Sequence, residues 1–119
     1  MAKVTILIAE DDPEILALTS LNLSSEGYQT LEAANGREAL ELYNQHRQEI
    51  RLVLLDLVMP VMGGQEVAET IRRSDSDTKI LFVSGFVPAG SGSDLKEPIL
   101  RKPYRASMLL DSVAELLGD

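Results

Sequence analysis

The sequence contains no cysteine, so the chain forms no disulfide and offers neither a thiolate nucleophile nor a thiolate metal ligand. No apolar run approaches the roughly 20 residues that a membrane-spanning helix requires. Basic residues are scarce: 11 Lys and Arg stand against 19 Asp and Glu, which gives a formal net charge of −8. An acidic chain binds nucleic acid poorly, because contacts with the phosphates require clustered Lys and Arg side chains. Protein or metal-ion partners are therefore expected.

What the sequence does have is the length and apolar content of one globular domain. Its 119 residues are 45% hydrophobic, which is enough to bury a core without covalent staples. We expect a single domain spanning residues 1–119. The N-terminal stretch "MAKVTILIAEDD" ends in acidic residues, where a secretory signal would carry a small-residue cleavage site. The sequence thus predicts a cytoplasmic protein.

Short apolar runs alternate with amphipathic segments along the chain. The runs that predict strands are "VTILIA" (4–9), "YQTLEA" (28–33), "RLVLLD" (51–56), "KILFVS" (79–84) and "PILRKP" (98–103). Segments with helical spacing of apolar residues lie at 13–26, 37–48, 65–74 and 105–118. This alternation predicts an α/β fold, a doubly wound parallel sheet with helices on both faces. In such folds the functional crevice lies at the carboxyl ends of the strands.

The ends of the predicted strands carry acids, one hydroxyl and one lysine: Glu10, Asp11, Asp12, Asp56, Ser84 and Lys102. Asp12 is best explained as a helix N-cap. The other carboxylates would repel one another if they met at one edge of the sheet. A Mg²⁺ ion would relieve that repulsion, and an aspartate beside it can attack phosphorus. Lys102 could then hold a phosphoryl oxygen as a point charge.

Four segments, "ILIAEDDPEI", "LVLLDLVMPVMGG", "ILFVSG" and "LRKPY", occur in an order and at spacings that resemble the receiver domain of two-component response regulators. The resemblance covers essentially the whole chain. It implies a flavodoxin-like sheet of five parallel strands in the order 2-1-3-4-5. It also implies that Asp56 is the phosphoacceptor, and that Glu10, Asp11, Asp56 and the backbone carbonyl of Val58 bind Mg²⁺.

The same resemblance implies roles for Ser84 as the switch hydroxyl and for Lys102 as the cation, with a cis peptide between Lys102 and Pro103. The expected partner is a histidine kinase or a histidine phosphotransfer domain, which docks beside the first helix. The protein would then be a signalling phosphoacceptor and not an enzyme acting on a separate substrate. It would catalyse its own phosphorylation and a slow hydrolysis of the acyl phosphate, and phosphorylation would switch a protein-interaction surface.

The sequence departs from the receiver pattern between Ser84 and Lys102. Ile99 stands three residues before Lys102, where receivers usually carry an aromatic side chain. The segment 87–98, which should hold a fourth helix, is rich in Gly, Pro and Ser and has low helix propensity. It predicts a fourth helix that is missing, very short or disordered. Since many receivers dimerise through this region, a monomer or weak atypical dimer is expected.

Two apolar residues stand at positions that flank the attacking water in receivers. Val58 lies two residues beyond Asp56, and Phe86 lies two residues beyond Ser84. We expect slow self-hydrolysis of the acyl phosphate for this reason. The sequence also ends after its last helical segment, so no output domain is expected within it.

Other functions fit the sequence less well. A phosphatase of the haloacid-dehalogenase type needs a second aspartate two residues beyond the nucleophile, where this chain has Val58. A flavodoxin-like cofactor binder needs a phosphate loop after the first strand, where "AEDDP" would repel phosphate. The alternative that remains open is a receiver-like interaction module that is not phosphorylated. The cognate kinase, the signal and the output are not encoded in any motif.

Overall fold

The computed structural model describes residues 3–85 and 97–118. Its five strands are β1 (Thr5–Ala9), β2 (Gln29–Ala33), β3 (Ile50–Asp56), β4 (Lys79–Ser84) and β5 (Ile99–Arg101). The described helices are α1 (Pro13–Ser25), α2 (Gly36–Gln45), α3 (Gly64–Ser74) and α5 (Ala106–Leu117). All strand pairs are parallel, and the sheet order is β2-β1-β3-β4-β5. The predicted doubly wound sheet and its strand order are confirmed.

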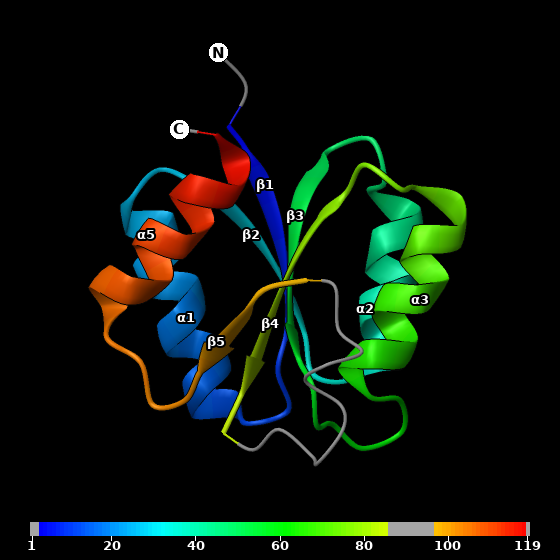
Figure 1. Ribbon diagram of the computed structural model, residues 1–119, viewed down its shortest axis with the longest axis horizontal. Helices are drawn as coiled ribbons and strands as arrows, with labels where there is room; N and C mark the ends of the chain where they lie inside the picture. The colour runs from blue at the N-terminus through cyan, green and yellow to red at the C-terminus, as the bar shows by residue number, and fades with distance from the viewer. Residues whose placement is uncertain (1–2, 86–96, 119) are drawn as a thin grey trace.

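The sheet separates two apolar cores. Figure 1 shows that α1 and α5 cover one face of the sheet and that α2 and α3 cover the other. Alternate residues of each strand supply the two cores because successive side chains in a strand point to opposite faces. Ile8 and Leu54 are buried in the α1/α5 core, whereas Leu7 and Val53 are buried in the α2/α3 core. This two-sided burial explains why β1, β3 and β4 are nearly continuous apolar runs in the sequence.

Side-chain caps fix where the first two helices begin. The Asp12 carboxylate accepts hydrogen bonds from the backbone N–H groups of Glu14 (2.9 Å) and Ile15 (3.3 Å). The predicted role of Asp12 as an N-cap is thus confirmed. Asn35 caps α2 by accepting from the N–H of Glu38 at 2.9 Å. No helix among the described residues is both long and apolar enough to cross a bilayer.

The edge strand β5 is shorter than the sequence pattern suggested. It covers three residues, and its Ile99 is half-buried against the α2/α3 core. Of the segment 87–98, for which a missing or short helix is predicted, residues 87–96 lie outside the described part, as does Phe86. The described Glu97 forms an ion pair with Arg72 of α3, with 3.1 Å between Oε2 and Nε. This contact ties the start of β5 to the α2/α3 layer.

Candidate functional site

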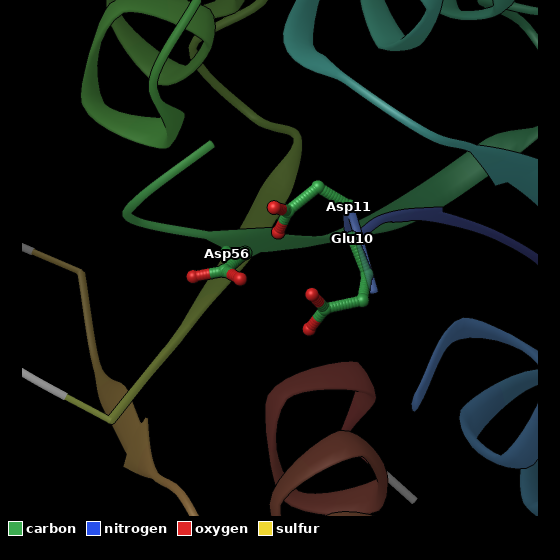
Figure 2. Close-up of side chains that lie close together, drawn as sticks. All are labelled: Glu10, Asp11 and Asp56. Atoms are coloured by element: carbon green, nitrogen blue, oxygen red, sulfur yellow. The ribbon is translucent and has the colours of Figure 1, made fainter. Parts of the chain in front are cut away.

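Three carboxylates meet at the carboxyl edge of the sheet. Glu10 and Asp11 follow β1, and Asp56 is the last residue of the neighbouring strand β3. One oxygen from each lies within 4.8 Å of the others, and Figure 2 shows Asp56 facing the side chains of the acidic pair. Glu10 and Asp56 are buried, while Asp11 is exposed. The acidic pocket predicted from the sequence is therefore present.

Lys102 lies between two of these carboxylates. Its Nζ is 2.6 Å from Oε1 of Glu10 and 3.0 Å from Oδ2 of Asp56. Strand alternation accounts for the meeting, since Glu10, Asp56 and Lys102 each stand two residues beyond an apolar side chain of the α1/α5 core. The peptide between Lys102 and Pro103 is cis, as the resemblance implied.

The charges at the site do not balance. Glu10, Asp11, Asp56 and Lys102 sum to −2 when all are ionised. Burial raises the pKa of Glu10, and the nearby Asp56 raises it further, against the lowering effect of the hydrogen bond from Lys102. Burial by itself would lower the pKa of Lys102, but its hydrogen bonds to Glu10 and Asp56 raise that pKa overall. Lys102 is thus held as a cation in a site that retains excess negative charge.

The loop after β3 positions Asp56 through backbone contacts. The N–H of Val58 donates to Oδ1 of Asp56 at 3.1 Å, while the Val58 side chain is 58% exposed. At the start of α3, Gly64 packs so tightly that a Cβ there would lie 3.0 Å from the carbonyl carbon of Asp56. Only glycine permits this approach without displacing the end of β3. The proposed metal contact of the Val58 carbonyl stays a prediction.

Ser84 closes the same edge of the sheet from β4. It is buried, and its carbonyl accepts a hydrogen bond from the N–H of Lys102 at 2.9 Å. This bond places Ser84 next to Lys102 in the backbone, as predicted from the strand order. The role of the Ser84 hydroxyl as a switch stays a prediction.

Two residues near the site were not singled out from the sequence. Thr19 of α1 and Tyr104, just beyond the cis peptide, form a hydrogen bond between their hydroxyls at 3.1 Å. Both also line a groove of about 660 Å³ between α1 and the turn after β5, together with Ile15, Leu18 and Lys102. A proline–aromatic pair after a site lysine is a weak signal in sequence, because it does not reveal which helix the aromatic hydroxyl will reach.

A doubly wound parallel sheet with an aspartate, an acidic pair and a lysine at its carboxyl edge defines the class of CheY-like, flavodoxin-fold domains. Residues 6–113 match the response regulator receiver domain family. The chain belongs to that family, as the motifs predicted.

Curated relatives include both short regulators and much longer proteins. The sensor kinase CckA of Brucella abortus is 34% identical over 117 residues, which cover 95% of this chain but only 12% of that protein. The response regulator receiver protein CpdR of the same species is 32% identical and is matched over 95% of its length. Sporulation initiation phosphotransferase F of Bacillus subtilis is 30% identical over 98% of this chain. The chain therefore resembles both short regulators and the receiver part of a far longer kinase.

Solved structures share the whole fold. The response regulator TrrA of Thermotoga maritima, solved in complex with Mg²⁺ and BeF, has a TM-score of 0.83 and 32% identity. The match covers 97% of this chain and 99% of TrrA. The arrangement of strands and helices is therefore that of experimentally solved response regulators.

Proposed function

We propose that the protein is a phosphoacceptor of a two-component phosphorelay, which accepts a phosphoryl group from a phosphohistidine onto Asp56. The observation that carries the proposal is the position of Lys102, whose ammonium group contacts both Asp56 and Glu10 in a pocket with one further carboxylate. If Lys102 only formed a structural ion pair, one carboxylate would be enough to balance its charge. A surplus of carboxylates around a single lysine fits a site that receives a divalent cation and a phosphoryl group.

The donor set suits Mg²⁺, which prefers hard oxygen ligands and takes few of them from protein. Glu10, Asp11 and Asp56 would hold the ion, with the Val58 carbonyl as a further ligand. When bound, Mg²⁺ supplies positive charge that offsets the phosphoryl oxygens. The fit is supported by the 4.8 Å span of the three carboxylate oxygens and by their hard-donor chemistry.

The chain's own residues would perform the transfer in line. A carboxylate oxygen of Asp56 forms the new O–P bond while the N–P bond of the phosphohistidine breaks and the imidazole leaves. Lys102, already 3.0 Å from Asp56, stabilises negative charge on the phosphoryl oxygens. Ser84 then hydrogen-bonds the acyl phosphate, which shifts the neighbouring loops between two arrangements. The chain thus catalyses its own modification and slowly hydrolyses it.

The groove beside α1 supports a docking place for the protein donor. It opens between α1 and Lys102 and is lined by Ile15 and by Leu18, which is 58% exposed. A histidine kinase or phosphotransfer domain that contacts this groove would bring its phosphohistidine to the edge that holds Asp56. The cytoplasmic location and the monomeric or weakly dimeric state stay predictions, which cell fractionation and size measurement with and without a phosphoryl mimic test.

Exposure to acetyl phosphate with Mg²⁺, followed by intact mass measurement, tests the proposal. We expect one phosphoryl adduct on the wild type and none on Asp56→Asn or without Mg²⁺. No adduct on the wild type, or an equal adduct on Asp56→Asn, would reject Asp56 as the phosphoacceptor and favour an interaction module that is not phosphorylated.

A further inference from the structure

A hydrogen bond between two hydroxyl groups links α1 to the turn that carries Lys102. Thr19 Oγ1 lies 3.1 Å from the Tyr104 hydroxyl, and the two residues are 85 positions apart in sequence. Thr19 is 3% exposed, and the Tyr104 ring packs against the α1/α5 core. Burial of this kind makes the hydrogen bond stronger and its loss more costly than at an exposed position.

The two hydroxyl-bearing residues lie next to the reacting groups. Thr19 and Tyr104 line one small cavity together with Glu10 and Asp56, and its other walls are apolar. Neither hydroxyl has a described hydrogen bond to a carboxylate of the site. A group that does contact those carboxylates is therefore needed to carry an effect of this hydrogen bond to them.

The hydrogen bond between Thr19 and Tyr104 can affect the position of Lys102, because the same turn carries Lys102 and Tyr104. On one side its backbone is fixed to β4 by the bond from its N–H to the Ser84 carbonyl. Two residues further on, the Tyr104 hydroxyl meets Thr19, before α5 begins at Ala106. Between these two attachments, the Nζ of Lys102 must reach Glu10 and Asp56 at 2.6 and 3.0 Å. Loss of the second attachment leaves this end of the turn held by apolar packing alone, without the hydrogen bond that ties it to α1.

We propose that Thr19 and Tyr104 are positioning residues for phosphorylation: their hydrogen bond holds the turn after β5 against α1 and so keeps the Lys102 ammonium group beside Asp56. This inference rests on the proposed phosphoacceptor function. It goes beyond that function because it assigns a role to two residues whose hydroxyls have no described hydrogen bond to the site's carboxylates or to Lys102. Positioning within a few tenths of an ångström matters, since charge stabilisation of the transition state depends on preorganised geometry.

The test compares initial rates of phosphorylation by acetyl phosphate at saturating Mg²⁺, read by intact mass. Tyr104→Phe and Thr19→Val each remove one hydroxyl and keep the shape of the side chain. We expect each to slow phosphorylation about 2-fold to 10-fold, the range that one neutral hydrogen bond supplies. Thr19→Ser retains the hydroxyl and should keep the wild-type rate. The double variant should be no slower than the slower single variant, because both remove the same bond.

Two controls separate positioning from a general loss of stability. Tyr43→Phe removes another buried tyrosine hydroxyl, which donates to Asp75 at 2.7 Å on the far side of the sheet. It should lower the free energy of unfolding and leave the phosphorylation rate unchanged. Mg²⁺ affinity, measured by calorimetry, should be the same in Tyr104→Phe as in the wild type.

The last arm tests whether the effect passes through Lys102. In a Lys102→Ala background, measured over longer times, Tyr104→Phe should have no further effect. An equal slowing in that background, or wild-type rates for both Tyr104→Phe and Thr19→Val, overturns the inference. Either result leaves the proposed function intact as long as the wild type is phosphorylated on Asp56. Absence of any adduct on the wild type rejects the proposed function itself.

Discussion

Lys102 and Glu10 stand 92 residues apart in the sequence, yet their side chains form the shortest of the site's ion pairs, at 2.6 Å between Nζ and Oε1. The pair is largely buried, with the Lys102 side chain 20% exposed and that of Glu10 6% exposed. Removal of one partner from such a pair leaves an uncompensated charge. We therefore expect the charge balance among Glu10, Asp56 and Lys102 to govern both the stability of the protein and its proposed chemistry.

Lys102→Ala should destabilise the protein in the absence of divalent cations. Glu10 and Asp56 would then lose their shared partner, and we expect the free energy of unfolding to fall by about 1–3 kcal/mol. Added Mg²⁺ should restore most of that loss, since it supplies the missing positive charge. Urea denaturation with EDTA and with Mg²⁺ measures both effects. Lys79→Ala, an exposed lysine at the start of β4, is the control and should show neither.

Glu10→Gln should stabilise the metal-free protein at neutral pH. The folded-state pKa of Glu10 is raised by burial above its ordinary value of 4.5, so the folded state binds more protons than the unfolded chain. Stability from this group is fully present below pH 4.5 and is lost as pH rises through the raised value. The variant and the wild type should thus have similar stability at low pH and diverge as pH rises.

Urea denaturation in EDTA at a series of pH values checks this difference. Glu41→Gln, which removes an exposed carboxylate on α2, should show no such divergence. Glu10→Gln should also weaken Mg²⁺ binding in calorimetry, because an amide oxygen is a poorer ligand than a carboxylate. A variant that is less stable than the wild type at neutral pH contradicts the assigned direction.

Leu18→Glu should slow phosphoryl transfer from a protein donor but not from a small-molecule donor. Leu18 lines the groove beside α1 and is 58% exposed, so the substitution should cost little stability. Transfer from a phosphohistidine-bearing domain should slow about 10-fold as apolar contact is lost, while phosphorylation by acetyl phosphate stays unchanged. Leu21→Glu is a matched control on the same helix, 63% exposed and outside the groove lining. Equal transfer to both variants would place the donor elsewhere.

Val58→Asn should shorten the lifetime of the acyl phosphate. Val58 is exposed beside Asp56, where an apolar side chain gives no hydrogen bond to an attacking water. An asparagine amide could orient that water by a hydrogen bond. Orientation of a reactant in this way raises the rate of hydrolysis several-fold or more. Loss of the adduct after removal of acetyl phosphate, followed by intact mass, measures the half-life. Val61→Asn in the same loop is the control, and a Val58→Asn half-life as long as that of the wild type contradicts the expectation.

Val61→Asn should instead raise stability. Val61 has a φ of 73°, a left-handed conformation that β-branched residues rarely adopt, and its side chain is 70% exposed. Asparagine tolerates this conformation, and the exchange removes no buried contact. We expect the free energy of unfolding to rise by about 0.5–1 kcal/mol in urea denaturation. A decrease would mean that the valine side chain contributes packing that outweighs its backbone strain.

The fold was predictable because the apolar sequences of β1, β3 and β4 indicate burial directly. The runs that end at Ala9, Asp56 and Ser84 are apolar on both faces, and such strands occur in parallel sheets covered by helices. The end of β5 was less predictable, since an edge strand is paired on one side only and its burial pattern is weak. A prediction for residues 87–98 falls almost wholly outside the described residues and is not tested by the fold.

The candidate site was predictable in its composition and less so in its contacts. Strand order and direction bring Glu10, Asp56 and Lys102 to one edge, and this follows from the sequence pattern with the parallel-sheet rule. The hydrogen bond between Thr19 and Tyr104 did not follow, because it depends on the angle at which α1 crosses the turn after β5. Packing of two cores sets that angle, and no local pattern records it.

The sequence by itself determined the elements of this protein, its acidic character and the residue types at the end of each strand. Those properties are local, since they depend on side-chain chemistry and on the two periodicities of strand and helix. Only the tertiary structure decided that one lysine contacts two carboxylates, that Asp11 is exposed while Glu10 is buried, and that Tyr104 meets Thr19. Distances between side chains far apart in sequence arise from the packing of whole layers, and the chemistry proposed for Asp56 depends on those distances.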